Sequence, residues 1–210
     1  MEKDILITGA KGFIGSRLKG GRSFKGKIES YKNCLNQVKG TKGIIHLAAL
    51  SNHRSCSTEP KKCIETNLIG LINILETAFK KNIWVLFIST YAVKEPNLYG
   101  LTKLAGEELC RLYQTKGLKV SILRLPIVYG PNDRPDKVVT KIINQIKEGL
   151  EPKINTDQKF HFALAEDAAK MIENEVRVIS GGRGKKYSLH DLVTGIKKCL
   201  KEENKQADHN

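Results

Sequence analysis

The sequence predicts an α/β fold built on a parallel sheet, because short apolar runs alternate with helical stripes along the chain. A second observation is that three glycines, Gly9, Gly12 and Gly15, directly follow the first apolar run. Glycines at that place let the backbone turn sharply, approach a pyrophosphate and pack against the next helix, whose N–H groups would bind the phosphates. The expected strands cover residues 5–7, 43–50, 83–88 and 120–125.

Apolar residues recur at helical spacing in further segments. They predict helices over residues 67–80, 98–116, 137–148 and 188–201. The first ends in lysines, which suit a helix C-terminus, and Ser188 is a suitable cap for the last. The polar tail 202–210 lacks apolar anchors, so we expect it to be flexible.

Composition bounds the class of protein. The 210 residues, 40% hydrophobic and 28% charged, suit one well-buried domain, or one domain with a small appendage. No apolar run is long enough to span a membrane and the start lacks a signal-peptide layout, so we expect a cytoplasmic protein with no membrane partner. The net charge of +14 would attract nucleic acid, membranes or small phosphorylated ligands. Because the lysines are spread out with no stacking aromatics among them, no nucleic-acid partner is expected.

The cysteines do not resemble a disulfide framework, because they are odd in number and scattered. We therefore expect all of them to be reduced. His53, Cys56 and Cys63 lack a Cys-x-x-Cys pair and a fourth ligand, so no metal site is predicted. The five cysteines are Cys34, Cys56, Cys63, Cys110 and Cys199.

A candidate for acid/base chemistry lies in the predicted helix 98–116. Tyr99 and Lys103 are four residues apart, which places the phenol and the ammonium on one face of a helix. A nearby ammonium favours the phenolate and lowers the pKa of the tyrosine. Ser89 and Thr90 follow the strand 83–88, at the carboxyl end where open α/β sheets bind ligands.

With these residues placed, the chain resembles the extended short-chain dehydrogenase/reductase family of nucleotide-sugar epimerases, dehydratases and 4-keto reductases. Its segments follow the family order: Thr8-Gly-Ala-Lys-Gly-Phe-Ile-Gly15, His46-Leu-Ala-Ala49, Asn67, Ser89-Thr90, Tyr99-x-x-x-Lys103, Arg124-Leu-Pro-Ile-Val-Tyr-Gly-Pro131 and Tyr187-Ser-Leu-His-Asp-Leu192. The resemblance implies a Rossmann-like doubly wound sheet, a nucleotide-sugar substrate, and NAD or NADP as cofactor, with NAD preferred. It also implies a homodimer formed through helices 67–80 and 98–116.

The resemblance assigns a role to each catalytic candidate. Tyr99 is the acid/base, Lys103 lowers its pKa and contacts the nicotinamide ribose, and Thr90 hydrogen-bonds the reacting sugar oxygen. Arg134 and Arg183, with Lys185 and Lys186, are candidates for binding the substrate diphosphate, although most basic residues face water. The residues implied to line the cofactor are Gly9, Gly12, Phe13, Ile14, Gly15, Leu47, Ala48, Ala49, Asn67, Ser89, Tyr99, Lys103 and Pro126. Alanines after a strand also serve close packing alone.

The chain departs from the family after Leu18. The segment 19–33 resembles the family's third strand and its loop, so the second strand and its helix are expected to be missing. The acidic residue that binds the adenosine ribose in relatives then has no clear counterpart, because Glu29 falls beyond the third strand. Arg22 and Lys25 could instead meet a 2′-phosphate, which leaves NADP open.

The expected organisation is a dinucleotide-binding core over 1–130 and a reduced substrate lobe over 131–157 and 176–201, with 158–175 returning to the core. The leading hypothesis is an NAD(P)-dependent epimerase that acts on a UDP- or dTDP-hexose through a 4-keto intermediate. The alternatives are an NAD(P)H-dependent 4-keto reductase and a non-catalytic nucleotide-binding or scaffold protein. Dehydration is disfavoured, because Tyr91-Ala92 stand where the family's dehydratases carry an Asp-Glu pair.

Overall fold

The computed structural model describes residues 4–154, 159–174, 187–188, 193–194 and 197. The chain divides into two units, one formed by Met1–Leu125 and Ala165–Gly182, the other by Pro126–Leu164 and Arg183–Asn210. The core therefore ends at Leu125 instead of residue 130, and the chain returns to it at Ala165 instead of residue 158. The reason is that residues 127–129 and 162–164 pair with each other as strands of the second unit.

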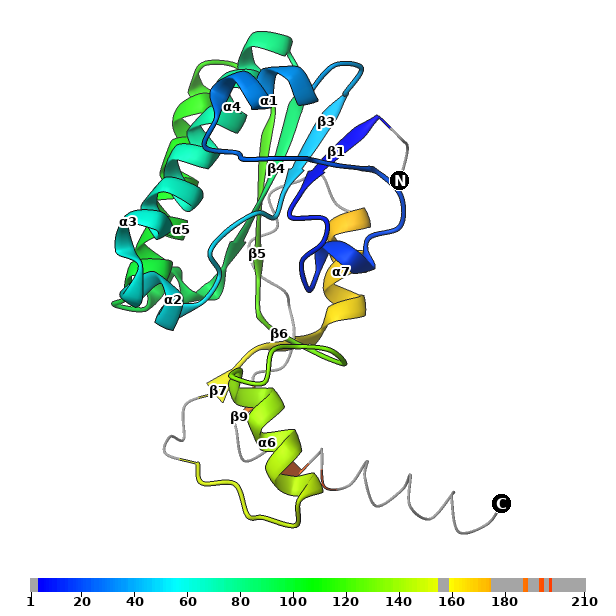
Figure 1. Ribbon diagram of the computed structural model, residues 1–210, viewed down its shortest axis with the longest axis vertical. Helices are drawn as coiled ribbons and strands as arrows, with labels where there is room; N and C mark the ends of the chain where they lie inside the picture. Colours follow the sequence, from blue (N-terminus) through cyan, green and yellow to red (C-terminus); the bar gives the residue numbers. More distant parts are fainter. Residues whose placement is uncertain (1–3, 155–158, 175–186, 189–192, 195–196, 198–210) are drawn as a thin grey trace. The chain divides into compact units, whose positions relative to one another are not determined.

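The first unit contains a five-stranded sheet in the order β2-β1-β3-β4-β5, and every neighbouring pair is parallel (Figure 1). This confirms the predicted α/β class. The predicted strand 43–50 ends four residues early, because residues 47–50 turn away at the carboxyl edge of the sheet. The strands are β1 (Ile5–Thr8), β2 (Arg22–Ser23), β3 (Gly43–His46), β4 (Trp84–Thr90) and β5 (Val120–Leu125).

Helices lie on both faces of this sheet (Figure 1). One face carries α1 (Tyr31–Gln37), α4 (Gly70–Lys81) and α5 (Leu98–Thr115), and the other carries α7 (Ala165–Asn174). The main core fills the space between the sheet and α4 and α5, with Leu6, Ile44, Phe87, Leu71, Ile74 and Leu75 at its centre. Within the described part of the chain, no helix has the length and apolar character needed to span a membrane.

Short helices lead into α4. They are α2 (His53–Thr58), α3 (Pro60–Ile64) and the π-helical turn η2 (Glu65–Ile69). The predicted helix 67–80 therefore covers the end of η2 and most of α4. The periodicity does not reveal α1, α2 and α3, because each is too short to form an apolar stripe and depends on local caps. Ser30 accepts a hydrogen bond from Asn33 N–H, Asn52 accepts one from Ser55 N–H, and Pro60 begins α3.

The crossover from β1 to β2 is abbreviated. It contains only the three-residue 3-10 helix η1 (Gly15–Arg17) where a full helix usually lies. Gly20 and Gly21, both with φ above +75°, then turn the chain so that β2 runs directly beside β1, with Leu6 opposite Arg22. Among the described residues no strand lies beyond β2. The contraction predicted after Leu18 is present, and Arg22–Ser23 takes the place next to β1.

The described residues of the second unit include two small strand pairs and the helix α6. Strand β6 (Ile127–Tyr129) pairs in parallel with β8 (Phe162–Leu164), and β7 (Lys159–Phe160) pairs antiparallel with β9 (Tyr187–Ser188). Helix α6 (Val138–Lys147) matches the predicted helix 137–148. The predicted helix 188–201 and tail 202–210 lie mostly outside the described residues.

Candidate active site

The glycine turn after β1 is folded tightly on itself. Gly12 N–H donates to Gly9 O (2.9 Å), and a Cβ added to Gly15 would lie 2.2 Å from that same oxygen. Gly9 has φ +72°, and a Cβ there would lie 2.8 Å from Ala48 N. The predicted cofactor residues Gly9, Gly12, Gly15, Leu47 and Ala48 are therefore close together. The expectation of a full helix behind this turn is wrong, because the chain makes only η1 before it turns towards β2.

Side-chain contacts connect the glycine turn to η1 and η1 to helix α7. The guanidinium carbon of Arg17 lies 4.4 Å from the centroid of the Phe13 ring. Ile14 is the residue before η1. Arg17 Nε also forms an ion pair with Glu166 of α7 (2.8 Å). Helix α7 therefore packs against η1, the short helix of the abbreviated crossover.

A buried polar contact joins the ends of β1 and β3. Thr8 Oγ1 accepts a hydrogen bond from Ala48 N–H (3.1 Å) and lies 2.9 Å from Nδ1 of His46. Burial, together with the charge of Lys103, lowers the pKa of His46 to about 3. His46 is therefore neutral at physiological pH, and it holds the residue before the glycine turn in place.

Asn67 holds the turn that follows β3. Its Oδ1 accepts from Leu50 N–H (2.7 Å), while its Nδ2 donates to Leu50 O (3.2 Å) and to Thr102 Oγ1 of α5 (3.0 Å). The side chain is buried, and Ala49 lies within the turn that it fixes. The structure thus places Asn67 as a link between the predicted cofactor turn and the helix of Tyr99.

Thr90 and Tyr99 lie on segments that pack directly together. Thr90 ends β4 and caps η3 (Tyr91–Lys94) by accepting from Ala92 N–H (3.2 Å). Asn97 caps α5 through Gly100 N–H (2.9 Å). A Cβ on Gly100 would lie 2.2 Å from Ala92 O, so this glycine allows α5 to begin against η3. Sequence reasoning missed Gly100, although it stands beside Tyr99 in the motif.

Lys103 points into the protein. Its Nζ donates to Ile88 O (2.8 Å) and lies 4.8 Å from the centroid of the Phe87 ring. Burial lowers the pKa of Lys103 to about 8, while electrostatic interactions with Cys110 and Glu107 act to raise it. The ammonium is therefore the main form at neutral pH, one helical turn from Tyr99.

The hydroxyl of Ser89 is directed towards α5. Ser89 Oγ donates to Glu107 Oε1 (2.5 Å), and both residues are buried. Arg124 binds the same carboxylate in a bidentate manner, through Nε to Oε1 (2.7 Å) and Nη2 to Oε2 (2.6 Å). Sequence reasoning missed Glu107, although a glutamate one turn after Lys103, on the same helix face, was a usable signal.

The residues considered for the adenosine end are engaged elsewhere. Arg22 Nη2 donates to Gln37 O (2.7 Å) at the end of α1 and to Thr41 Oγ1 (2.8 Å). Glu29 accepts from Thr66 Oγ1 (2.8 Å) and so lies beside η2. Lys25 is exposed. Neither Arg22 nor Glu29 is therefore held at the carboxyl end of β2.

The remaining predicted residues belong to the second unit or to undescribed segments. Pro126 begins the second unit. Arg134 also lies there, with Nε 3.5 Å from Asp136 Oδ1. Arg183, with Lys185 and Lys186, falls outside the described residues.

The expectation that all cysteines are reduced is wrong for one pair. Cys56 of α2 and Cys63 of α3 form a disulfide, because the turn at Glu59 brings their Cα atoms to 5.1 Å. Cys34 and Cys110 are free and buried, and burial raises the pKa of each thiol, to about 11 and about 12. Cys199 lies outside the described residues.

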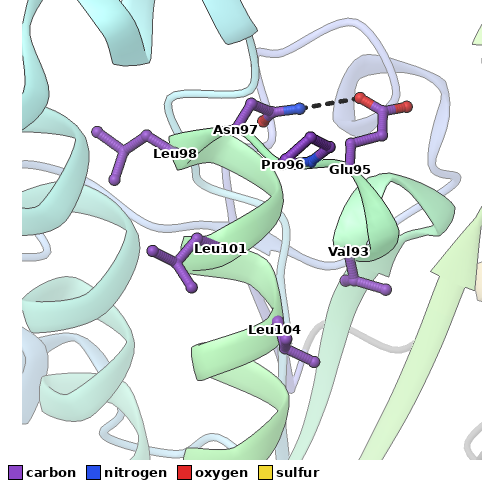
Figure 2. Close-up of a pocket in the computed structure, with 7 residues that line it drawn as sticks. All are labelled: Val93, Glu95, Pro96, Asn97, Leu98, Leu101 and Leu104. Carbon is purple, nitrogen blue, oxygen red and sulfur yellow. Dashed lines mark hydrogen bonds between the residues drawn. The ribbon is translucent and has the colours of Figure 1, made fainter.

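An apolar cavity of about 440 Å³ lies over the opposite face of α5 (Figure 2). It is lined by Val93, Glu95, Pro96, Asn97, Leu98, Leu101 and Leu104. Asn97 Nδ2 donates to Glu95 Oε2 (2.9 Å) at its rim. Leu98, Leu101 and Leu104 lie on the face of α5 that borders this cavity, whereas Lys103 is buried and Tyr99 is half-buried.

Comparison with known proteins decides the family. The model of the NAD dependent epimerase/dehydratase family matches residues 24–177, a segment that contains Thr90, Tyr99 and Lys103 and begins after the glycine turn. The chain belongs to this family. The resemblance predicted from the sequence motifs is thereby confirmed.

Members of the epimerase/dehydratase family resemble this chain over most of its length. The "Putative UDP-glucose 4-epimerase" of Methanocaldococcus jannaschii is 30% identical, with 92% of this chain and 81% of that protein covered. The "Uncharacterized UDP-glucose epimerase YtcB" of Bacillus subtilis is 30% identical over 67% of this chain. The chain covers 61% of that protein's length and 47% of UDP-glucuronate 4-epimerase 1 of Arabidopsis thaliana.

Solved structures share the fold. MoeE5 in complex with UDP-glucose and NAD has a TM-score of 0.80 and 25% identity, with 93% of this chain and 81% of that chain covered. UDP-glucose 4-epimerase of Thermotoga maritima, with UDP-glucose, has a TM-score of 0.80, with 92% and 81% covered. Its 22% identity supports the fold alone. These comparisons confirm the Rossmann-like architecture.

Proposed function

We propose that this protein is an NAD-dependent 4-epimerase of a UDP-hexose. The observation that carries this proposal is that α5, the helix of Tyr99 and Lys103, is held against the chain on both sides of Thr90. A Cβ on Gly100 would lie 2.2 Å from Ala92 O, two residues after Thr90, and Lys103 Nζ donates to Ile88 O, two residues before it. Relatives named as UDP-sugar epimerases and the NAD and UDP-glucose complex of MoeE5 support the same substrate class. UDP is therefore favoured over dTDP as the nucleotide.

The glycine turn fits a dinucleotide. Side chains are absent at Gly9, Gly12 and Gly15, where the backbone folds most tightly, so a pyrophosphate can approach the main chain. We expect these residues, the Ala48 turn and Lys103 to hold NAD, which supplies reversible hydride transfer with the sugar carbon. Arg22 already donates to the carbonyls of Gln37, at the end of α1, and Lys39, just after it, which favours NAD over NADP.

Tyr99 is the acid/base of this proposal. Oxidising a sugar alcohol to a 4-keto intermediate requires the hydroxyl proton to leave, and a phenolate at Tyr99 would take it and later return it. Lys103 favours the phenolate because it carries an ammonium one turn away, and its bond to Ile88 O holds it in place. Thr90 would bind the reacting sugar oxygen beside the phenol. Return of the hydride to the opposite face of the ketone would invert the carbon, while Tyr99 returns the proton to the oxygen.

The test compares two identical substitutions on one helix. Tyr99→Phe should lower turnover of UDP-glucose or UDP-galactose by about 10²–10⁴-fold, because the proton acceptor is lost. Tyr113→Phe is the matched control, since Tyr113 lies farther along α5 and donates to Glu76. Its turnover should equal that of the wild type. Binding of NAD to both variants, followed by fluorescence titration, shows that the cofactor site is intact.

Each other result identifies an alternative. Sustained, substrate-dependent consumption of NAD(P)H would show a 4-keto reductase, because an epimerase regenerates its cofactor. Equal behaviour of wild type and Tyr99→Phe with every nucleotide sugar would show a non-catalytic nucleotide-binding protein. Failure of NAD and NADP to bind would overturn the whole proposal.

We also propose that the protein forms a homodimer through α4 and α5. Leu101, Leu104 and Leu112 of α5 and Phe79 of α4 are large apolar side chains left exposed. Phe79 packs edge-to-face on Tyr113, so the two helices form one surface. Leu101→Lys should shift the dimer to monomer in analytical ultracentrifugation, because it places a charge in the apolar contact. Leu150→Lys, at another exposed leucine, should leave the oligomeric state unchanged.

A further inference from the structure

Glu107 is a fully buried carboxylate in the middle of α5. Both of its oxygens accept two hydrogen bonds. Oε1 takes Ser89 Oγ (2.5 Å) and Arg124 Nε (2.7 Å), and Oε2 takes Arg124 Nη2 (2.6 Å) and Arg111 Nη2 (3.2 Å). Burying a charge without partners is strongly unfavourable, so this set of partners explains how a carboxylate is tolerated here.

The partners of Glu107 flank Thr90. Ser89 is the residue before Thr90 in β4, and Arg124 of β5 stands directly opposite Ser89 in the sheet. Lys103, one turn before Glu107, donates to Ile88 O, which precedes Ser89. Two successive turns of α5 are therefore fastened to consecutive residues of β4, immediately before Thr90. Tyr99 lies one turn beyond Lys103 on the same helix.

The carboxylate also sets the charge around Lys103. Burial acts to raise the pKa of Glu107, but hydrogen bonds from Arg124 and Ser89 and the charges of Arg124 and Arg111 lower it overall, so Glu107 stays ionised. Lys103 interacts electrostatically with His46 from β3 and with Cys110 and Glu107 along its own helix. His46 is neutral, and burial keeps the Cys110 thiol protonated. Glu107 is thus the ionised acid among these neighbours.

We propose that Glu107 is a positioning residue that fastens the helix of Tyr99 and Lys103 to the strand end of Thr90 and supplies the negative charge behind Lys103. This role rests on the proposed function, because it assigns the geometry of the same catalytic groups. Glu107 does not reach the substrate. It acts through Ser89 and Arg124 on one side and through Lys103 on the other.

The experiment separates the effect of the charge of Glu107 from the effect of its side-chain length. Glu107→Gln keeps the length of the side chain and removes its charge, whereas Glu107→Asp keeps the charge and shortens the side chain. Glu108→Gln is the matched control, since Glu108 is the next residue of α5, is exposed, and also pairs with Arg111. If a Glu107 variant does not fold, Ser89→Ala tests the positioning role of Glu107, because it removes one hydrogen bond and leaves the Glu107–Arg124 ion pair intact.

For a folded enzyme we expect kcat of both Glu107 variants to fall about 10-fold or more, since small misplacements of reacting groups are costly. KM and the dissociation constant of NAD should change less than about twofold, because binding groups are untouched. Ser89→Ala should also lower kcat with little change in KM, but by a smaller factor than the Glu107 variants. Glu108→Gln should match the wild type. Losses that merely follow the unfolded fraction, or that appear equally in Glu108→Gln, would overturn the proposal.

A second readout needs no turnover. Lys103 can be labelled with a small amine-reactive reagent across a pH range and quantified by mass spectrometry. Removing the adjacent negative charge should move the labelling midpoint of Lys103 to lower pH in Glu107→Gln but not in Glu107→Asp or Glu108→Gln. An unchanged midpoint in Glu107→Gln would overturn the proposal. A wild-type protein without turnover on any nucleotide sugar would instead overturn the proposed function.

Discussion

Replacing Gly9 by alanine tests whether the tight turn after β1 is a cofactor site or only a chain reversal. Gly9 has φ +72°, where alanine is strained by about 1–2 kcal/mol. Its added Cβ would also lie 2.8 Å from Ala48 N and 3.0 Å from the Leu47 carbonyl carbon. These are backbone atoms that cannot rotate away, so overpacking should add about 1–3 kcal/mol. The expected loss of stability is about 2–5 kcal/mol, the sum of both effects.

Gly40→Ala is the matched control for this change. Gly40 has φ +68° but nothing within 4 Å of an added Cβ, so it carries the backbone strain without the contact. Urea unfolding should show a loss of about 1–2 kcal/mol for Gly40→Ala, as expected for the left-handed conformation alone. NAD titration should show weaker binding for Gly9→Ala and unchanged binding for Gly40→Ala. Equal destabilisation of the two variants, or unchanged NAD affinity in Gly9→Ala, would refute the reasoning.

Two further predictions concern stability. His46 has a folded-state pKa of about 3 against 6.5 when unfolded, so the unfolded chain binds the extra proton first and stability falls as pH decreases through this window. At pH 5 the loss should be about 2 kcal/mol relative to pH 7 in urea unfolding, and His46→Gln should remove this contribution. The Cys56–Cys63 disulfide closes a short loop with a separation of 7, so reduction should cost about 2 kcal/mol. A Cys56→Ser/Cys63→Ser double variant whose stability still changes with reductant would contradict this.

The residues proposed to be catalytic could be selected from the sequence because their signals are local. Tyr99 and Lys103 are four residues apart, and a helix brings such a pair to one face wherever it packs. Thr90 was predictable because a hydroxyl at the carboxyl end of a parallel strand lies at the ligand-binding edge. The burial of Lys103 could not be predicted, because it depends on contacts with Ile88 O and the Phe87 ring of strand β4.

What sequence reasoning missed depends on contacts between distant residues. Ser89 was assigned to the cofactor, yet its hydroxyl is bound by Glu107, 18 residues later. The disulfide was missed because nothing in the spacing of Cys56 and Cys63 shows that two short helices meet at Glu59. Strand β2 lies within the segment 19–33 that was expected to supply a strand, but its bounds were not predictable, because two residues, one of them an arginine, cannot form an apolar run.

A buried row of side chains connects the glycine turn to the catalytic helix. Thr8 contacts His46, the His46 and Phe87 rings stack with centroids 6.0 Å apart, and Lys103 lies over Phe87. Burial lowers the pKa of both bases in this row, His46 to about 3 and Lys103 to about 8. At neutral pH the two therefore differ in charge, His46 neutral and Lys103 mainly protonated. The Lys103 ammonium, proposed to favour the Tyr99 phenolate, therefore has no cationic histidine beside it. The neutral His46 remains able to contact Thr8 at the start of the glycine turn.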